Sequence, residues 1–335
     1  MARALVLAAV LLSLAGCSRQ DETAPFAESR TPPGLAARFM APEGWAWGFV
    51  EAGDAPVQRY GVAAPSGAPR SQVLILTGYG ESAEAWFETA RDLNARGTIV
   101  WVLERAGQGG SGRYATPRDL GHVADFGPDV AAVKAMREVV IRPDGRLPFV
   151  ILAQDDAAVV ALQAVEDGLR VDGLVLTSPR WPAAVGSARM PALLQSLGLG
   201  ALSRPGWTRW RRDGPGGRAA DQTHDPDRGQ VQHAWQVANP DLRMSGPSLG
   251  WRAAFDRARG AAGKRLGAVH RPVLMLLPAG RRDPELGLCR ELPDCAPLAI
   301  PGARRALHLE RDPQRGRWLD EVSRFIAARR AGPPA

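Results

Sequence analysis

The chain has 335 residues, of which 45% are hydrophobic and 23% charged, so it can bury a large core. Its 42 basic and 35 acidic side chains give a formal net charge of +7, but the two signs are interleaved. Only Lys134 and Lys264 are lysines, a bias that a GC-rich genome explains more simply than a binding surface does. No nucleic-acid-binding motif is present, so we expect no nucleic-acid partner, whereas a weak attraction to anionic lipid headgroups is compatible with the charge.

The first residues have the organisation of an export signal. Arg3 precedes an apolar run of about a dozen residues, which is too short to span a bilayer. The run ends in "LAGC" (14–17), which resembles a bacterial lipobox and implies that Cys17 becomes the lipidated first residue of the mature protein. Because Ser18 is not an aspartate, we expect a lipoprotein that Cys17 anchors in the outer membrane, facing the periplasm. No later segment is long and apolar enough to cross a membrane.

The polar, proline-bearing composition that follows predicts a simple domain organisation. We expect a signal peptide at 1–16, a flexible tether at 17–40 and one domain at 41–330.

Apolar runs alternate with helix-like segments, which predicts an α/β fold with a mostly parallel eight-stranded sheet and helices on both faces. The first two strands, separated by "GDAP", are expected to form an antiparallel edge. The expected strands are 44–52, 58–64, 72–77, 98–104, 149–154, 173–178, 272–277 and 296–301. The expected helices are 82–96, 127–141, 157–168, 251–265 and 313–329.

A long insertion at about 179–250 interrupts this alternation. It lies at the carboxyl edge of the expected sheet, where ligands usually bind, so we interpret it as a cap. Its candidate pocket-lining residues, each of which could instead simply pack the cap onto the core, are Trp181, Met190, Trp207 and Trp210.

Two cysteines remain once Cys17 is assigned to lipidation. Cys289 and Cys295 lie in "LGLCRELPDCAP", and an oxidising periplasm would permit a disulfide between them, the alternative being two free thiols. No histidine or second cysteine pair completes a zinc site, and we expect no metal or other cofactor.

The stretch "FVILAQDDAAVVALQAV" (149–165) predicts a buried strand, a sharp turn and a helix. Many hydrolases place a nucleophilic serine in such a turn, within the pattern G-x-S-x-G. Here the same positions hold Ala153, Gln154, Asp155, Asp156 and Ala157. Alanine is small enough to replace the two glycines, so the turn itself can persist.

Motifs spread over residues 60 to 320 resemble the α/β-hydrolase fold, and more narrowly its lysophospholipase and monoacylglycerol lipase group of serine hydrolases. The motifs are "TGYGESAEAWFETARDLNARG" (77–97), "RAGQGGSGR" (105–113), "GHVADF" (121–126), "GPSLGW" (246–251) and "GARRALHLERD" (302–312). The resemblance implies an oxyanion hole formed by the backbone N–H groups of Tyr79 and Asp156.

The same resemblance locates a catalytic triad whose residues have all changed. Asp155 stands in the nucleophile position and Arg305 in the histidine position. The acid position holds Arg282, with Asp283 one residue later. Our first hypothesis is therefore a scaffold that has lost Ser-His-Asp chemistry, in which Asp155 and Arg305 form a static ion pair. Such a pseudo-hydrolase would bind a lipid, another apolar small molecule or a protein partner.

A second hypothesis keeps an active enzyme. Epoxide hydrolases and haloalkane dehalogenases use an aspartate at this position, so Asp155 could attack an ester, lysophospholipid or epoxide-type substrate with His308 as base and Asp283 as its orienting acid. A third hypothesis uses a displaced serine, Ser178 or Ser111, near a strand end. The other histidines are weaker candidates: His122 belongs to a turn motif and is expected to be structural, His224 and His233 lie in the cap, and His270 precedes a strand.

Overall fold

The computed structural model describes residues 23–181, 193–194, 197–203, 208–214, 221–279 and 284–329. The predictions for Cys17, Met190, Trp207, Arg282 and Asp283 lie outside these residues.

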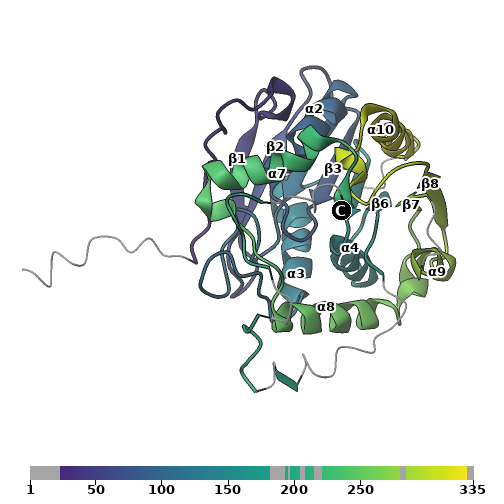
Figure 1. The fold of residues 1–335 in the computed structure, drawn as a ribbon. Coiled ribbons are helices and arrows are strands. Elements are labelled where there is room, and N and C mark those ends of the chain that lie inside the picture. Colours follow the sequence, from purple (N-terminus) through teal and green to yellow (C-terminus); the bar gives the residue numbers. More distant parts are fainter. Residues whose placement is uncertain are drawn as a thin grey trace, which may run out of the picture.

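One eight-stranded sheet forms the centre of the domain, with strand order β1-β2-β4-β3-β5-β6-β7-β8 (Figure 1). The strands from β3 to β8 pair in parallel, whereas β1 pairs with β2, and β2 with β4, antiparallel. The α/β fold and its antiparallel edge are therefore confirmed. The strands are β1 Ala46–Val50, β2 Gln58–Ala63, β3 Ser71–Leu76, β4 Thr98–Leu103, β5 Phe149–Gln154, β6 Gly173–Thr177, β7 Val273–Pro278 and β8 Cys295–Ile300.

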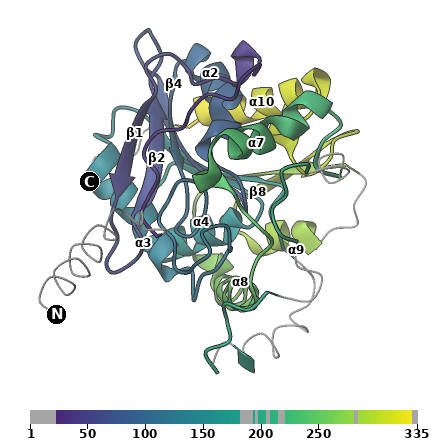
Figure 2. The same cartoon turned by 60° about the vertical axis from the view of Figure 1, so that its left-hand side comes forward.

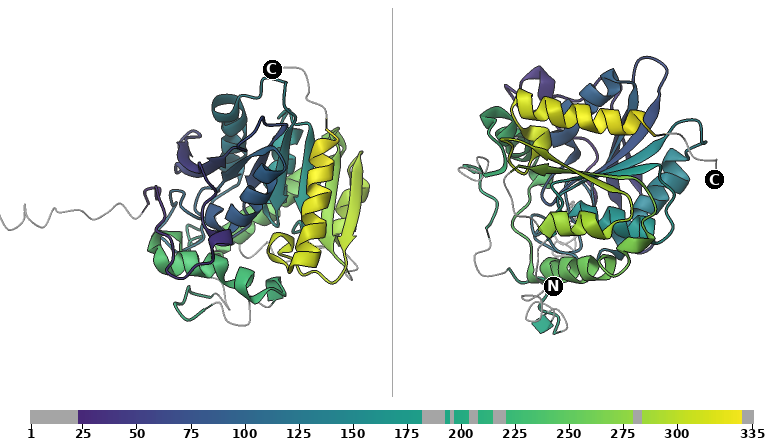
Figure 3. Two further views of the ribbon diagram at one scale, coloured as in Figure 1. Left: turned by 90° about the horizontal axis from the view of Figure 1, so that it is seen from above. Right: turned by 90° about the vertical axis from the view of Figure 1, so that its right-hand side faces the viewer.

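The central strands are apolar runs because helices cover both faces of the sheet. Every residue of β3, β5, β6 and β7 is buried. Helices α2 and α10 pack on one face, and α3, α4, α8 and α9 on the other (Figure 3). The helices are α2 Phe87–Ala95, α3 Gly127–Ala135, α4 Ala157–Glu166, α7 Pro226–Ala238, α8 Leu249–Ala262, α9 Pro284–Glu291 and α10 Asp312–Ala327.

Two expected helices differ in their internal geometry. The segment expected as a helix at 82–96 begins as the 3-10 turn η2 (Ala83–Trp86) before α2. The segment 127–141 ends as the π-helical η3 (Met136–Ile141). No helix within the described ranges is long and apolar enough to cross a membrane.

Helices α7 and α9 were not predicted. Helix α7 follows Asp225, whose side chain accepts hydrogen bonds from the backbone N–H groups of Asp227 and Arg228. The Arg228 side chain then joins the helix to α2 through Glu88 at 2.8 Å and to α10 through Asp312 at 2.7 Å. This cap helix is thus fixed to the core by charged contacts.

The segment 23–40, which we call the N-terminal strap, corrects the expectation of a flexible tether over these residues. Phe26 donates its backbone N–H to Gly110 O at 2.6 Å, and the Arg30 backbone exchanges two hydrogen bonds with the side chain of Asn239. Phe39, in the 3-10 turn η1 (Ala37–Phe39), is buried in a cluster that includes Trp235 of α7. The strap, dark purple in Figure 2, therefore folds onto the domain and reaches the cap helix.

Candidate active site

Asp155 lies in a sharp turn between β5 and α4, as its sequence context predicted. Its φ of 52° is in the left-handed region, which aspartate tolerates better than most residues. Its N–H donates to Thr177 O at 3.1 Å and its carbonyl accepts from Arg180 N at 2.9 Å. The turn thus presents the Asp155 side chain at the carboxyl end of the sheet.

Two guanidinium groups hold the Asp155 carboxylate. Arg305 Nη2 donates to Oδ1 at 2.9 Å, which is the expected ion pair, and Arg180 Nη2 donates to Oδ2 at 2.5 Å. Arg305 is further fixed by the carbonyl of Ser178 at 2.8 Å and lies 3.6 Å from Glu285 Oε1. The side chains of Asp155 and Arg305 are 16% and 19% exposed, whereas that of Arg180 is 48% exposed.

This arrangement opposes nucleophilic chemistry at Asp155. Charge-assisted hydrogen bonds stabilise the carboxylate that would have to attack. A guanidinium has no lone pair with which to accept a proton, so Arg305 cannot act as the base that a triad histidine provides. Arg180 was not identified from the sequence, because it lies in a loop after β6 that carries no recognisable motif.

The predicted oxyanion hole is occupied by the protein's own side chain. The Tyr79 backbone N–H donates to Asp156 Oδ1 at 2.7 Å, and Arg105 Nη2 is paired with Asp156 Oδ2. Asp156 is fully buried, and burial raises its pKa while the Arg105 guanidinium opposes that shift. One of the two expected donors is therefore unable to bind a substrate oxygen in this arrangement.

His308 is not hydrogen-bonded to Asp155 in the structure. Its ring is fully buried and stacks on Trp86 at a centroid distance of 3.9 Å and an interplanar angle of 4°. Neither ring nitrogen has a hydrogen-bond partner within the described residues. Burial lowers the pKa of His308 to about 3, so the imidazole is neutral and weakly basic at neutral pH.

Glu81 is a titratable group beside the site that the sequence did not single out. Its Oε2 accepts from Gly78 N at 2.8 Å and Trp86 Nε1 at 3.2 Å, and its Oε1 lies 3.6 Å from His308 Nε2. Burial raises the pKa of Glu81 to about 7. Its place in the motif "TGYGE" was the available signal, since this motif forms the loop that carries Tyr79.

The two candidate serines lack a base. Ser178 is buried with a φ of 44°, and its Oγ has no hydrogen-bond partner among the described residues. Ser111 Oγ donates to Glu104 O and accepts from Arg59 N. Neither hydroxyl contacts an imidazole among the described residues, so the geometry supports neither serine as an activated nucleophile.

Three of the other four histidines make local side-chain contacts away from Asp155. They pair with Ser248 Oγ (His122), Glu310 Oε1 (His224) and Arg212 O (His233). Trp181 is buried in the core, and Trp210 donates to Gln236 Oε1. Both tryptophans therefore have packing or hydrogen-bonding roles within the cap and core.

A disulfide joins Cys289 of α9 to Cys295 of β8, with a Cα–Cα distance of 5.4 Å.

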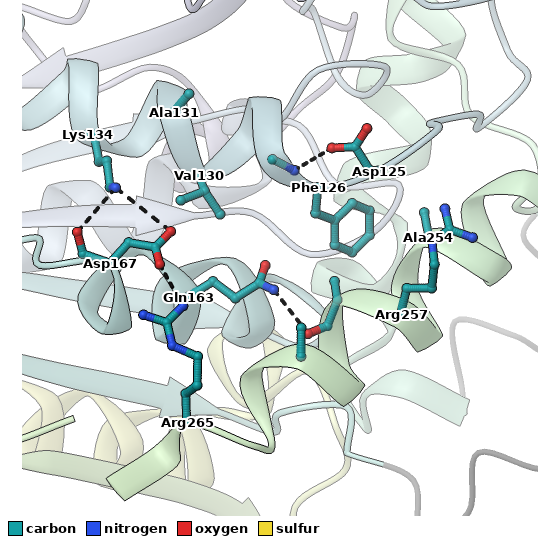
Figure 4. A pocket seen from close by; sticks show the side chains of 13 residues that line it. Asp125, Phe126, Val130, Ala131, Lys134, Gln163, Asp167, Ala254, Arg257 and Arg265 are labelled. Carbon is teal, nitrogen blue, oxygen red and sulfur yellow. Dashed lines mark hydrogen bonds and ion pairs between the residues drawn. The ribbon is translucent and has the colours of Figure 1, made fainter. Parts of the chain in front are cut away.

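A cavity of about 440 Å³ lies away from Asp155, between α3, α4 and α8 (Figure 4). Residues such as Phe126, Gln163 and Arg265 line it, and none of the predicted site residues does.

The fold and the turn define an α/β hydrolase in which Asp155 stands in the turn after β5 and pairs with Arg305. Its sequence matches that of the family described as serine aminopeptidase, S33, over residues 67–284, and the chain belongs to this family. It is 27% identical over 189 residues to Lysophospholipase L2 of Escherichia coli strain K12, covering 53% of this chain and 54% of that protein. The chain thus spans about half the length of the curated relatives it matches.

Solved structures show the same fold at low identity. A thermostable carboxyl esterase from Bacillus coagulans superposes with a TM-score of 0.69 at 17% identity, covering 86% of this chain and 98% of that one. A soluble variant of monoglyceride lipase from Saccharomyces cerevisiae gives a TM-score of 0.63 at 15% identity, covering 85% and 96%.

Proposed function

We propose that this protein is a lipid-anchored pseudo-hydrolase of the bacterial envelope, which binds a lipid or similar apolar molecule without Ser-His-Asp catalysis. The observation that carries the proposal is the pairing of Asp155 with both Arg180 and Arg305. Arg305 replaces the proton-accepting group with one that is permanently charged, and the pairing turns the nucleophile position into a salt-bridged anion.

A second, independent feature supports the loss of catalysis. Loss of a single oxyanion-hole donor reduces kcat by about a hundredfold to a thousandfold in hydrolases that depend on one. Here the Tyr79 N–H is bound by the buried Asp156 carboxylate, which Arg105 holds in place. An ester carbonyl would have to displace a charged, fully buried group to reach this donor.

The names of the relatives favour a lipid-like ligand. The relatives are a lysophospholipase and a monoglyceride lipase, both of whose names describe ligands with one acyl chain and a polar head. Lipidation at Cys17 would keep the protein at the surface where such molecules are found.

The test combines turnover, labelling and binding on the purified mature chain. We expect no hydrolysis of lysophosphatidylcholine or monoacylglycerol above buffer and no labelling by a fluorophosphonate probe, together with saturable binding of a monoacylglycerol. Turnover or serine labelling would overturn the loss of catalysis, and absence of binding would overturn the ligand class. An epoxide or alkyl halide adduct on Asp155, detected by mass spectrometry, would establish the alternative enzyme that uses Asp155 and His308.

A further inference from the structure

The N-terminal strap brings the anchor of the proposed lipoprotein close to the folded domain. Thr23 O accepts a hydrogen bond from Arg113 N at 2.8 Å, so the strap is already fixed at its first described residue. Six residue steps separate Cys17 from Thr23, and they span at most about 20 Å when fully extended. A free tether to residue 40 would instead span up to about 80 Å. With Cys17 acylated, Thr23 would therefore lie within about 20 Å of the lipid surface.

Contacts connect the start of the strap to the cap. Arg118 Nη1 donates to Ala24 O of the strap at 2.5 Å, and its Nε donates to Asp241 O at 3.1 Å. Arg113 Nη2 also donates to Asp241 O, at 3.1 Å. Asp241 lies two residues before Arg243, so Arg113 and Arg118 connect the start of the strap to the segment that carries Arg243.

That segment belongs to a group of arginines around Trp210, which we call the basic cap patch: Arg209, Arg211, Arg212 and Arg243. The Arg243 guanidinium lies 4.1 Å from the Trp210 ring centroid. The Trp210 backbone N–H donates to Ser245 Oγ at 2.9 Å, which fixes this part of the cap. Arg209, Arg211 and Arg212 are exposed.

The positive charge of the patch is only partly compensated. Arg211 pairs with Asp213 at 2.7 Å. Within the described part of the chain, no carboxylate forms an ion pair with Arg209, Arg212 or Arg243. Burial and the like charge of Arg212 lower the pKa of Arg243, and the nearby carboxylates of Asp119 and Asp241 only partly oppose this shift. Arg228 of the same insertion shows the contrast, because it pairs with Glu88, Asp225 and Asp312.

We propose that the basic cap patch faces the membrane that holds the Cys17 anchor and binds the anionic headgroups of its lipids. Guanidinium groups bind phosphate with paired hydrogen bonds, which suits exposed arginines to phospholipid headgroups. This placement of the patch rests on the proposed lipidation of Cys17. The lipids that it binds are those of the leaflet that holds this anchor. This placement also puts the cap, rather than the opposite edge of the sheet, against the lipid.

The headgroup test uses the full mature chain with Cys17→Ser, so that binding is not dominated by acyl chains. Cosedimentation is measured with phosphatidylcholine vesicles, with or without phosphatidylglycerol, at low and high salt. Each basic residue near an anionic surface contributes about fivefold to partitioning, so Arg209→Gln together with Arg212→Gln should weaken binding about 25-fold. The matched control is Arg170→Gln with Arg271→Gln, two exposed arginines just before β6 and β7, at the opposite end of these strands from Asp155.

Each outcome decides the proposal. Salt-sensitive binding to phosphatidylglycerol vesicles that falls only in the cap variant supports it. Equal losses in both variants would show a response to net charge alone, and binding without preference for anionic lipid would also overturn it. Equally tight binding to polyglutamate would assign the patch to an acidic polymer instead. Mass spectrometry of the mature chain that retains Cys17 separately tests acylation of this residue. The hydrolysis assays separately test the proposed loss of catalysis.

Discussion

The strength of the Asp155–Arg305 pair can be measured by a double-mutant cycle with Asp155→Asn and Arg305→Gln. Asparagine suits this test because it tolerates the left-handed backbone at residue 155 while removing the charge. Exposed ion pairs contribute about 0.2–1 kcal/mol, and breaking a buried pair costs about 3–5 kcal/mol. With the two side chains 16% and 19% exposed, we expect a coupling free energy of about 2 kcal/mol.

The ion pair between Asp155 and Arg180 provides a control for this measurement, because it involves the same carboxylate. The Arg180 side chain is 48% exposed, so solvent screens this pair and we expect a coupling of about 1 kcal/mol or less with Asp155→Asn. Equilibrium unfolding should be measured in urea, which, unlike guanidinium chloride, does not screen charges. Additive effects of Asp155→Asn and Arg305→Gln would refute the static pair, as would a larger coupling for Arg180 than for Arg305.

Three further predictions concern the surroundings of the site. Burial raises the pKa of Glu81 to about 7, so the folded state loses stability as pH rises from about 4.5 through 7. The variant Glu81→Gln should therefore be more stable than the parent chain by up to about 3 kcal/mol above pH 7, and should differ little from it below pH 4.5. Parallel curves of stability against pH for the two proteins would contradict this. Gly121→Ala would place a Cβ 1.8 Å from the Tyr79 hydroxyl, so it should destabilise the folded protein by about 1–3 kcal/mol in thermal unfolding. Adding Tyr79→Phe should recover part of the loss, and an unchanged melting temperature would contradict the close packing. Asn239→Ala removes both hydrogen bonds to the Arg30 backbone, so limited trypsin digestion should cleave faster after Arg30 than in the parent chain, and an unchanged rate would show that the strap is held elsewhere.

The sequence predicted the sheet well because its strands are buried on both faces. Runs such as Phe149–Gln154 are apolar throughout, and turn residues mark their ends. The pairing of Asp155 with Arg305 was also predictable, since the family resemblance brings these two loops to the same end of the sheet. Both predictions depend on backbone topology, which hydrophobic pattern and motif order largely determine.

Other parts of the site depend on side-chain geometry that no local pattern reveals. The Asp156 carboxylate reaches the Tyr79 N–H across 77 residues of sequence, and the prediction had assigned only its backbone to the oxyanion hole. The strap was mistaken for a tether because its polar, proline-rich composition hides the hydrophobic cluster that Phe39 shares with residues of the cap helix. Helix α7 was missed because two of its four buried side chains, Arg228 and Gln236, are polar, so little hydrophobic periodicity marks it.

Restoring the family residues at two positions should not restore hydrolysis. In Asp155→Ser with Arg305→His, the Tyr79 N–H would still be bound by Asp156, so the oxyanion would lack one of its donors. Removing the Asp156 carboxylate as well would leave the buried Arg105 without its partner, at a cost of about 3–5 kcal/mol. We therefore expect neither fluorophosphonate labelling nor esterase activity from the double variant, and a marked loss of stability from the triple variant with Asp156→Ala. Labelling of the double variant would show that Asp156 yields to substrate, and it would contradict the blocking role that we assign to its carboxylate.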